Sequence, residues 1–161
     1  MDSHMTTSKI IVYVVFAAAT VAACGKSKKP ETAPADIGST GYVVDVPAGW
    51  TVKMDMDRFY SVEGAGGSGP QIIDQPSGSP GTLDVDIKNL CDGRTDVHKD
   101  AIGKSGYWYT CKGESKMMKG VVTTKIAAIV PRDGQGFFDC HLETDEDPAQ
   151  ALAICKSIHK K

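Results

Sequence analysis

The chain has 161 residues and a formal net charge of −2, and 41% of its residues are apolar. This length suggests one domain with tails, and the apolar share supplies one modest core. The near-neutral charge argues against a nucleic-acid-binding protein, which needs a basic surface facing phosphates. No stretch after residue 23 is long and apolar enough to span a bilayer as a helix.

Residues 1–23 have the pattern of an export signal. We exclude Met1–Met5 from the fold because MDSHM is typical of a cloning remnant or an upstream start codon. Lys9 supplies a weakly positive start, and an apolar run follows over Ile10–Ala23. This run is too short for a membrane-spanning helix, which needs about 20 residues, but it suits the central region of a signal peptide.

The apolar run ends in Val21-Ala22-Ala23-Cys24-Gly25. This ending resembles the lipobox of bacterial lipoproteins, in which small residues precede a cysteine whose thiol takes a diacylglyceryl group. The resemblance implies cleavage before Cys24 and acyl chains such as palmitate on that residue, so that a lipid bilayer becomes a partner of the chain. Gly25 stands where inner-membrane lipoproteins of enteric bacteria carry Asp, which favours the outer membrane and leaves its periplasmic or surface face open.

Residues 24–40 are polar and contain Pro30 and Pro34, so we expect the lipidated cysteine to be followed by a flexible tether. A single globular domain is expected over residues 41–161. Its first strands are predicted at Tyr42–Val46 and Trp50–Met54, on either side of a turn at residues 47–49. A third strand is predicted at Arg58–Glu63.

The sequence in the middle of the domain predicts a loop, a strand and a short helix in turn. Glycine and proline dominate residues 64–81, which predicts a long loop with a brief strand at Gln71–Asp74. Apolar and polar residues alternate over Leu83–Asn89, as in a half-buried strand. Thr95 or Asp96 is placed to cap a short helix that reaches Ile102 and stops at Gly103.

The last third predicts an antiparallel meander followed by a helix. Strands are expected at Tyr107–Lys112, Val121–Val130 and Phe137–Thr144. Asp147 and Pro148 suit the start of the last helix. The apolar stripe of that helix consists of Ala151, Ile154, Cys155 and Ile158. The predicted fold class is α+β, an antiparallel sheet packed against this C-terminal helix and a short second helix.

Four cysteines remain beside Cys24, and an even number in an exported chain predicts disulfides. Alternation in the last strand points Cys140 to the core, and Cys155 lies on the apolar stripe of the helix that follows. We therefore predict the bond Cys140–Cys155. The remaining pair, Cys91–Cys111, then forms the second bond.

The sequence shows no pattern for a catalytic, metal or cofactor site. No cysteine pair has C-x-x-C spacing, and His98 and His141 stand at no ligand interval, so neither a metal nor a cofactor is expected. His141 lies on the polar face of its strand, and no nucleophile motif accompanies it. Aromatic residues that could contact a partner are Tyr107, Trp108 and Tyr109, although core packing is the competing interpretation.

Two further motifs suggest a fold family. The segment Tyr42–Val52 (YVVDVPAGWTV) resembles the opening hairpin of the PsbP-like superfamily, and Ile154–Ile158 resembles its closing apolar-x-Ser-apolar helix. The resemblance covers residues 42–158 in outline. It implies antiparallel strands between the two motifs and a non-catalytic assembly or binding module; the four cysteines and the long loop depart from the pattern.

These patterns predict an outer-membrane lipoprotein whose domain binds or assembles another protein or envelope component without being an enzyme. The alternative is a lipoprotein inhibitor or immunity protein that blocks a cell-wall hydrolase or a toxin. Small size, disulfides and a tether suit both functions.

Overall fold

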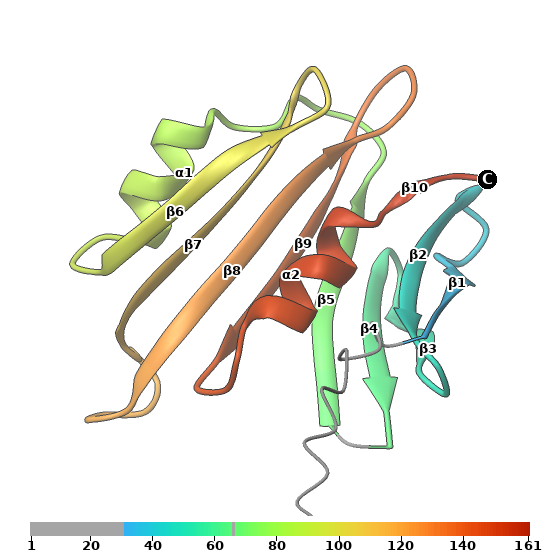
Figure 1. Cartoon of the computed structure of the whole chain (residues 1–161). Coiled ribbons are helices and arrows are strands. Elements are labelled where there is room, and N and C mark those ends of the chain that lie inside the picture. Colours follow the sequence, from blue (N-terminus) through green and yellow to red (C-terminus); the bar gives the residue numbers. More distant parts are fainter. Residues whose placement is uncertain (1–30, 66) are drawn as a thin grey trace, which may run out of the picture.

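The computed structural model of the protein describes residues 31–65 and 67–161 (Figure 1). Within these residues the strands are β1 (Thr32–Asp36), β2 (Tyr42–Pro47), β3 (Thr51–Met56), β4 (Phe59–Gly64), β5 (Gly67–Gln75), β6 (Thr95–Ile102), β7 (Gly106–Glu114), β8 (Val122–Pro131), β9 (Phe137–Thr144) and β10 (His159–Lys160). The helices are α1 (Leu83–Leu90) and α2 (Ala149–Lys156). Antiparallel strands with two helices confirm the predicted α+β class.

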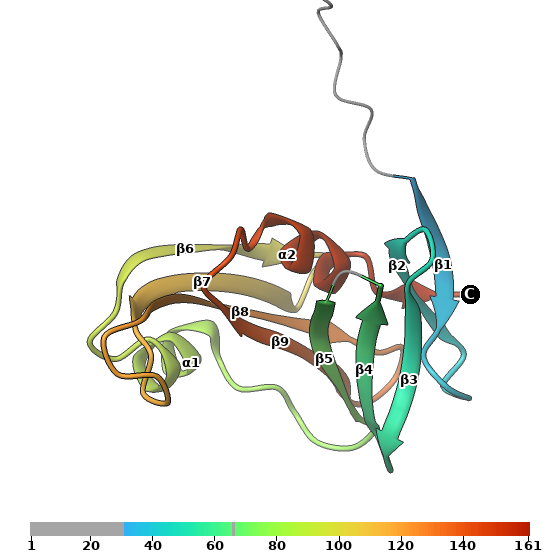
Figure 2. The same cartoon turned by 90° about the horizontal axis from the view of Figure 1, so that it is seen from below.

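The strands form two antiparallel sheets. The larger has seven strands in the order β3-β4-β5-β9-β8-β7-β6, and the smaller has three in the order β1-β2-β10. Helix α2 lies on one side of the large sheet, near the small sheet, and α1 lies on the opposite side (Figure 2). Each helix therefore covers a different face of the same sheet.

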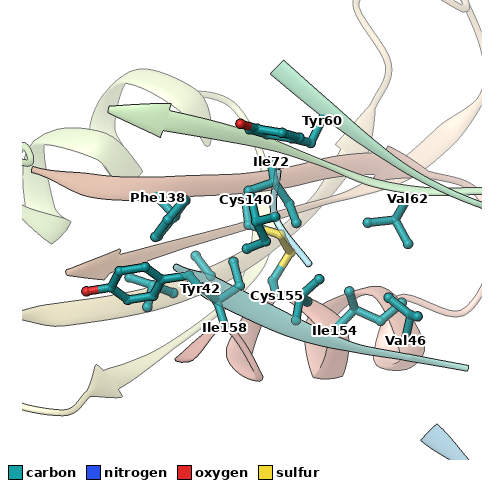
Figure 3. Close-up of a cluster of buried hydrophobic side chains, with 14 residues drawn as sticks. Tyr42, Val46, Tyr60, Val62, Ile72, Phe138, Cys140, Ile154, Cys155 and Ile158 are labelled. Atoms are coloured by element: carbon teal, nitrogen blue, oxygen red, sulfur yellow. A yellow bond between two sulfur atoms is a disulfide. The ribbon is translucent and has the colours of Figure 1, made fainter. Parts of the chain in front are cut away.

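The main core lies between the large sheet, the small sheet and α2. Its fully buried side chains include Val44 of β2, Val62 of β4, Ile72 of β5 and Phe138 of β9. The Cys140–Cys155 bond lies in the middle of this cluster, and both cysteines are fully buried (Figure 3). It joins β9 to α2 at the point where the two elements pack.

Both disulfide bonds have the predicted pairing. Cys140 and Cys155 have their Cα atoms 5.5 Å apart, and those of Cys91 and Cys111 are 5.9 Å apart. The second bond links the end of α1 to β7 on the other face, where Tyr107, Tyr109 and Ile129 form a smaller cluster. Each helix is thus tied covalently to the sheet face that it covers.

The predicted strand at Leu83–Asn89 is wrong, because this segment is helix α1. The half-buried apolar residues are Leu83 and Ile87, four positions apart, whereas Val85 between them is 51% exposed. Asp84 and Asp86 in the first turn and Lys88 in the last match the helix dipole. Over so few residues, an i, i+4 pair also satisfies a two-residue alternation.

The predicted short helix from Thr95 or Asp96 to Ile102 is also wrong, because Thr95–Ile102 is strand β6. It pairs with β7 along its length, with a register shift between Thr95 and His98 where Asp96 has φ 51°. Gly103, read as a helix stop, has φ 59° in the turn that connects β6 to β7. Ladder hydrogen bonds to β7 prevail over the local capping signal.

The long loop predicted over residues 64–81 contains strand β5, which lies between β4 and β9. The glycines that made this segment look like a loop leave space for the indole ring of Trp50. A Cβ atom on Gly64 would overlap the indole Nε1 of Trp50, and one on Gly69 would lie 2.9 Å from the indole ring. These glycines therefore serve packing within strands rather than loop formation.

The ordered domain begins before residue 41, where the sequence placed its start. Part of the expected tether forms β1, which pairs with β2 from Thr32↔Pro47 to Asp36↔Val43. Residues 1–23, Cys24 and the tether up to residue 30 lie outside the described residues. The C-terminal strand β10 pairs with the opposite edge of β2.

The two motifs that suggested a fold family have clear structural roles. In the first, Trp50 N donates to Pro47 O across a tight turn in which Gly49 has φ 82°. In the second, the Ser157 hydroxyl accepts a hydrogen bond from Asp45 N at 2.8 Å and so joins the end of α2 to β2. Both motifs therefore fix how β2 docks on the rest of the domain.

We predict that the two disulfides contribute differently to stability. Replacing Cys140 and Cys155 together by Ala should lower the free energy of unfolding by about 3 kcal/mol from chain entropy, with a further loss from the unfilled core. Replacing Cys91 and Cys111 should cost a similar amount from chain entropy but less from packing, because the cluster around them is smaller, and it should mainly speed amide exchange in α1 and β6. Urea denaturation and hydrogen exchange would measure this; an equal or larger global loss for the second pair would contradict it.

Candidate functional site

The three aromatic residues considered as partner contacts are not surface anchors. Tyr107 and Tyr109 are 7% and 1% exposed and pack beneath α1, so for them the structure shows the core packing that was the competing interpretation. Trp108 points to the opposite face, where it is half-buried against the main core. The Lys156 ammonium lies 4.7 Å from the centre of its ring, which leaves little of it for a partner.

The face of the large sheet that carries α1 is only partly covered. Antiparallel register aligns Ser61, Gln71, His141, Ala127 and Tyr109 in one row across β4, β5, β9, β8 and β7. Directly opposed residues project from the same face. Helix α1 packs over the β7 end of this row, and the β9, β5 and β4 end carries half-buried or exposed side chains.

A hollow of about 290 Å³ lies where α1 ends on this face. Ala127 and Tyr109 line it from the sheet, and Leu90 of α1, itself 48% exposed, lines it from the helix. His141, Asp139, Lys125 and Glu143 also line it. The small side chain of Ala127 leaves space between the larger neighbours, so the hollow follows directly from the sequence of β8.

His141 is oriented by its neighbour on the same strand face. Its Nδ1 lies 3.2 Å from Asp139 Oδ1, and both side chains are partly exposed. The prediction that His141 lies on the polar face of β9 is confirmed, since Phe138 and Cys140 are fully buried on the other face. The contact through Nδ1 leaves Nε2 as the ring atom able to meet a ligand.

A partly buried ion pair fixes Glu143, which lines one side of the hollow. Arg94, whose side chain is 3% exposed, donates to Glu143 Oε1 at 2.7 Å, and the Thr123 hydroxyl donates to the same oxygen at 2.5 Å. Burial by itself raises the pKa of the Glu143 carboxyl, but the hydrogen bonds from Thr123 and Arg94 and the charges of Arg94 and Lys125 outweigh it and hold that pKa below its usual range.

The phenol of Tyr109 stays protonated beside this charged group. Burial, followed by the negative charges of Asp86 and Asp139, raises its pKa. Tyr107 has a raised pKa for related reasons: burial first, then its hydrogen bond to Asp86 Oδ2 at 2.6 Å. That bond joins β7 to α1 and positions the helix beside the hollow.

Other hollows lie around the start of α2. One is lined by Trp50, Gly69 and the acidic segment Asp145–Asp147, and another lies between α2 and the ends of β1 and β2. Within residues 31–65 and 67–161, no three His, Cys, Asp or Glu side chains are grouped to hold a metal ion. No helix in this part of the chain is long and apolar enough to cross a membrane.

The sequence matches no protein-family model and no curated protein sequence. The structure, by contrast, defines a PsbP-like fold. It is similar to the solution structure of cyanobacterial PsbP (CyanoP) from Synechocystis sp. PCC 6803, with a TM-score of 0.50 and 16% sequence identity. The match covers 88% of this chain and 99% of that chain. The similarity shows the fold and assigns no site residue.

We predict that Glu143 contributes stability that depends on pH. Because its folded-state pKa is lowered, the contribution is complete above the unfolded value of about 4.3 and is lost as the pH falls through the folded value. At pH 7, Glu143→Gln should cost about 2 kcal/mol, since it removes the charge that pairs with Arg94 but keeps one oxygen acceptor.

The difference in free energy of unfolding between the wild type and Glu143→Gln should therefore become smaller below about pH 4.3, as measured by urea unfolding at several pH values. Glu146→Gln is the matched control, because Glu146 is exposed and near in sequence. A difference in free energy of unfolding that stays constant or grows in acid would contradict the assigned role of Glu143.

Proposed function

We propose that the chain is an exported lipoprotein of the bacterial outer membrane, anchored through lipid on Cys24, whose domain is a non-enzymatic binding or assembly module. The lipobox-like segment around Cys24 supports the anchor. The two disulfides of the domain support export, because such bonds persist in oxidising compartments. The PsbP-like fold supports a binding or assembly role through the family resemblance of its two motifs.

The partly covered sheet face is the observation that carries the binding role. One face of the large sheet is occupied by α2 and the small sheet, whereas neither helix of the described residues lies on the other face over β4, β5 and β9 (Figure 2). Phe59 is 40% exposed there, next to half-buried Ile73 and exposed Gln71. Apolar side chains among polar ones are typical of the centre of protein interfaces.

The arrangement around His141 supports binding rather than hydrolysis. Asp139 orients the imidazole as in a catalytic triad, but no serine, threonine or cysteine of the described chain lines the hollow with it. The nearest hydroxyl nucleophile in the hollow, the Tyr109 phenol, is kept protonated by burial and by Asp86 and Asp139. We therefore propose that His141 contacts a ligand instead of activating a nucleophile.

The anchor predicts a defined product in the native cell. The mature chain should begin at Cys24, carry acyl chains on that residue and partition into detergent. Cys24→Ser should give an uncleaved precursor or a soluble product, because serine lacks the thiol that accepts lipid. Mass spectrometry of the native N-terminal peptide would decide; an unmodified Cys24 thiol would refute the anchor.

The binding role predicts a partner on one face of the large sheet. A photo-cross-linking residue at Gln71, which is exposed beside His141 on β5, should capture one defined partner in the native cell. The same residue at Lys112 is the control, since its position in the β7 alternation directs it to the opposite face. Capture of the same species at both positions, or at neither, would contradict binding through this face.

A further inference from the structure

The turn between β7 and β8, residues 115–121, presents apolar side chains to solvent. Met117 is 91% exposed, Met118 is 48% exposed, and Val122 at the start of β8 is 54% exposed. The exposed Lys116 and Lys119 stand on either side of the two methionines. Exposed apolar side chains gathered at one place and bordered by polar ones mark an interaction surface, because their burial would stabilise a contact.

The backbone of this turn is held by its own hydrogen bonds. The Ser115 hydroxyl accepts hydrogen bonds from Met117 N at 3.2 Å and from Met118 N at 3.3 Å. Glu114 Oε1 accepts one from Gly120 N at 2.7 Å. A free amide group is costly in apolar surroundings, so a turn whose amides are bonded internally can enter them in its folded form.

The chain enters the domain at the same end of the molecule. Glu31 O accepts a hydrogen bond from Ala48 N in the turn that joins β2 to β3. Thr32 lines a hollow together with Asp147, and Met118 lines a second hollow that Asp147 also borders. In Figure 1 the turn between β7 and β8 and the turn that leads into α2 both lie at the lower end of the domain.

The distance from Cys24 to Glu31 limits how far this end can lie from an anchor. Glu31 follows Cys24 by seven residues, and an extended chain spans about 3.5 Å per residue, or about 25 Å in all. A domain of this size has a radius of gyration of about 14 Å, so it is at least about 28 Å across. Lipid on Cys24 would therefore hold this end of the domain next to the bilayer.

The charges at this end fit a zwitterionic surface. Lys116 and Lys119 can reach headgroup phosphates while their side-chain stems lie along the apolar layer. Three carboxylates of Asp145–Asp147 border the hollow that Met118 lines, and they would be repelled by a strongly anionic surface. A headgroup such as phosphatidylethanolamine offers a phosphate to the lysines and an ammonium to the carboxylates.

We propose that the turn over residues 115–121 docks on the bilayer that holds the lipid anchor, with Met117 and Met118 inserted at the boundary between headgroups and acyl chains of zwitterionic phospholipid. Lys116 and Lys119 contact the phosphates. The inference rests on the proposed anchor at Cys24 and adds a second, reversible contact with the same membrane. Two contacts fix the orientation of the domain on the bilayer, whereas a single one does not.

The methionines themselves report on this contact. Those that follow Cys24 are Met54, Met56, Met117 and Met118. The test is ¹³C-methyl methionine NMR of the lipidated full chain in phosphatidylethanolamine–phosphatidylcholine nanodiscs that contain a lipid spin-labelled in its acyl chain. We expect the Met117 signal to lose at least four fifths of its intensity. Met54 is the internal control, because it is 61% exposed but lies on β3, and its signal should persist.

The outcomes separate the docking turn from the anchor. A lipidated chain whose Met117 signal persists, or loses no more intensity than Met54, would overturn the docking alone. An unmodified Cys24 together with loss of the Met117 signal on excess vesicles would refute the anchor and support the docking. A photo-cross-linking residue at Met117 should give lipid adducts in the native cell, and capture of one defined protein there instead would overturn the proposal.

Variants measure the contact without the anchor. In the full chain carrying Cys24→Ser, flotation with phosphatidylethanolamine–phosphatidylcholine vesicles should show weak binding. Replacing Met117 and Met118 together by Ser should weaken it about tenfold, because two apolar side chains are lost from the lipid. Met54→Ser is the matched control and should change nothing. Equal effects of the two replacements, or no binding of the parent chain, would contradict insertion of the turn.

Charge variants test the headgroup contact. Lys116→Glu should weaken vesicle binding about threefold, since it replaces a contact with phosphate by repulsion. Lys104→Glu makes the same change in the exposed turn between β6 and β7, at the other end of β7, and should leave binding unchanged. Binding that appears only when phosphatidylglycerol is added, or that weakens equally in both variants, would overturn the choice of a zwitterionic surface.

Discussion

Strand β9 links the two halves of the domain, because its side chains alternate between the faces of the large sheet. On one face Phe138 and Cys140 are fully buried, and Cys140 is bonded to Cys155 of α2. On the other face Glu143 accepts a hydrogen bond from the buried side chain of Arg94, which follows α1 in the chain. A shift of β9 by one residue would exchange these faces and break both connections, so its register constrains the whole fold.

The disulfide pairing was predictable because it depends on the direction of side chains in β9 and α2, and the sequence encodes both directly. The segments that became α1 and β6 were not, because each is short and fits two patterns. The apolar residues of Leu83–Leu90 satisfy a strand and a helix alike, and only packing on β7 chooses between them. In residues 64–81, the local sequence does not reveal that glycines are needed to leave space for Trp50, so strand β5 was read as a loop.

The hollow could be predicted only in part for the same reason. Sequence alternation placed His141 on the polar face, and the structure agrees. The other groups come from separate elements: Tyr109 from β7, Ala127 from β8 and Leu90 from α1. Their meeting depends on the strand order β9-β8-β7 and on where α1 ends. The usable signal was the small Ala127 between Lys125 and Ile129 on the same face of β8, which becomes informative once the neighbours across the sheet are known.

Strand β6 also affects how copies of the protein behave at high concentration. It ends the large sheet, and nearly all of its residues are exposed. Such an edge invites a strand from another molecule, which leads to aggregation. Here the left-handed Asp96 and the register shift interrupt the row of free amides, and Lys99 and Asp100 add charge along it. The irregular pairing that made this segment hard to read as a strand therefore also protects the protein against strand-to-strand polymerisation.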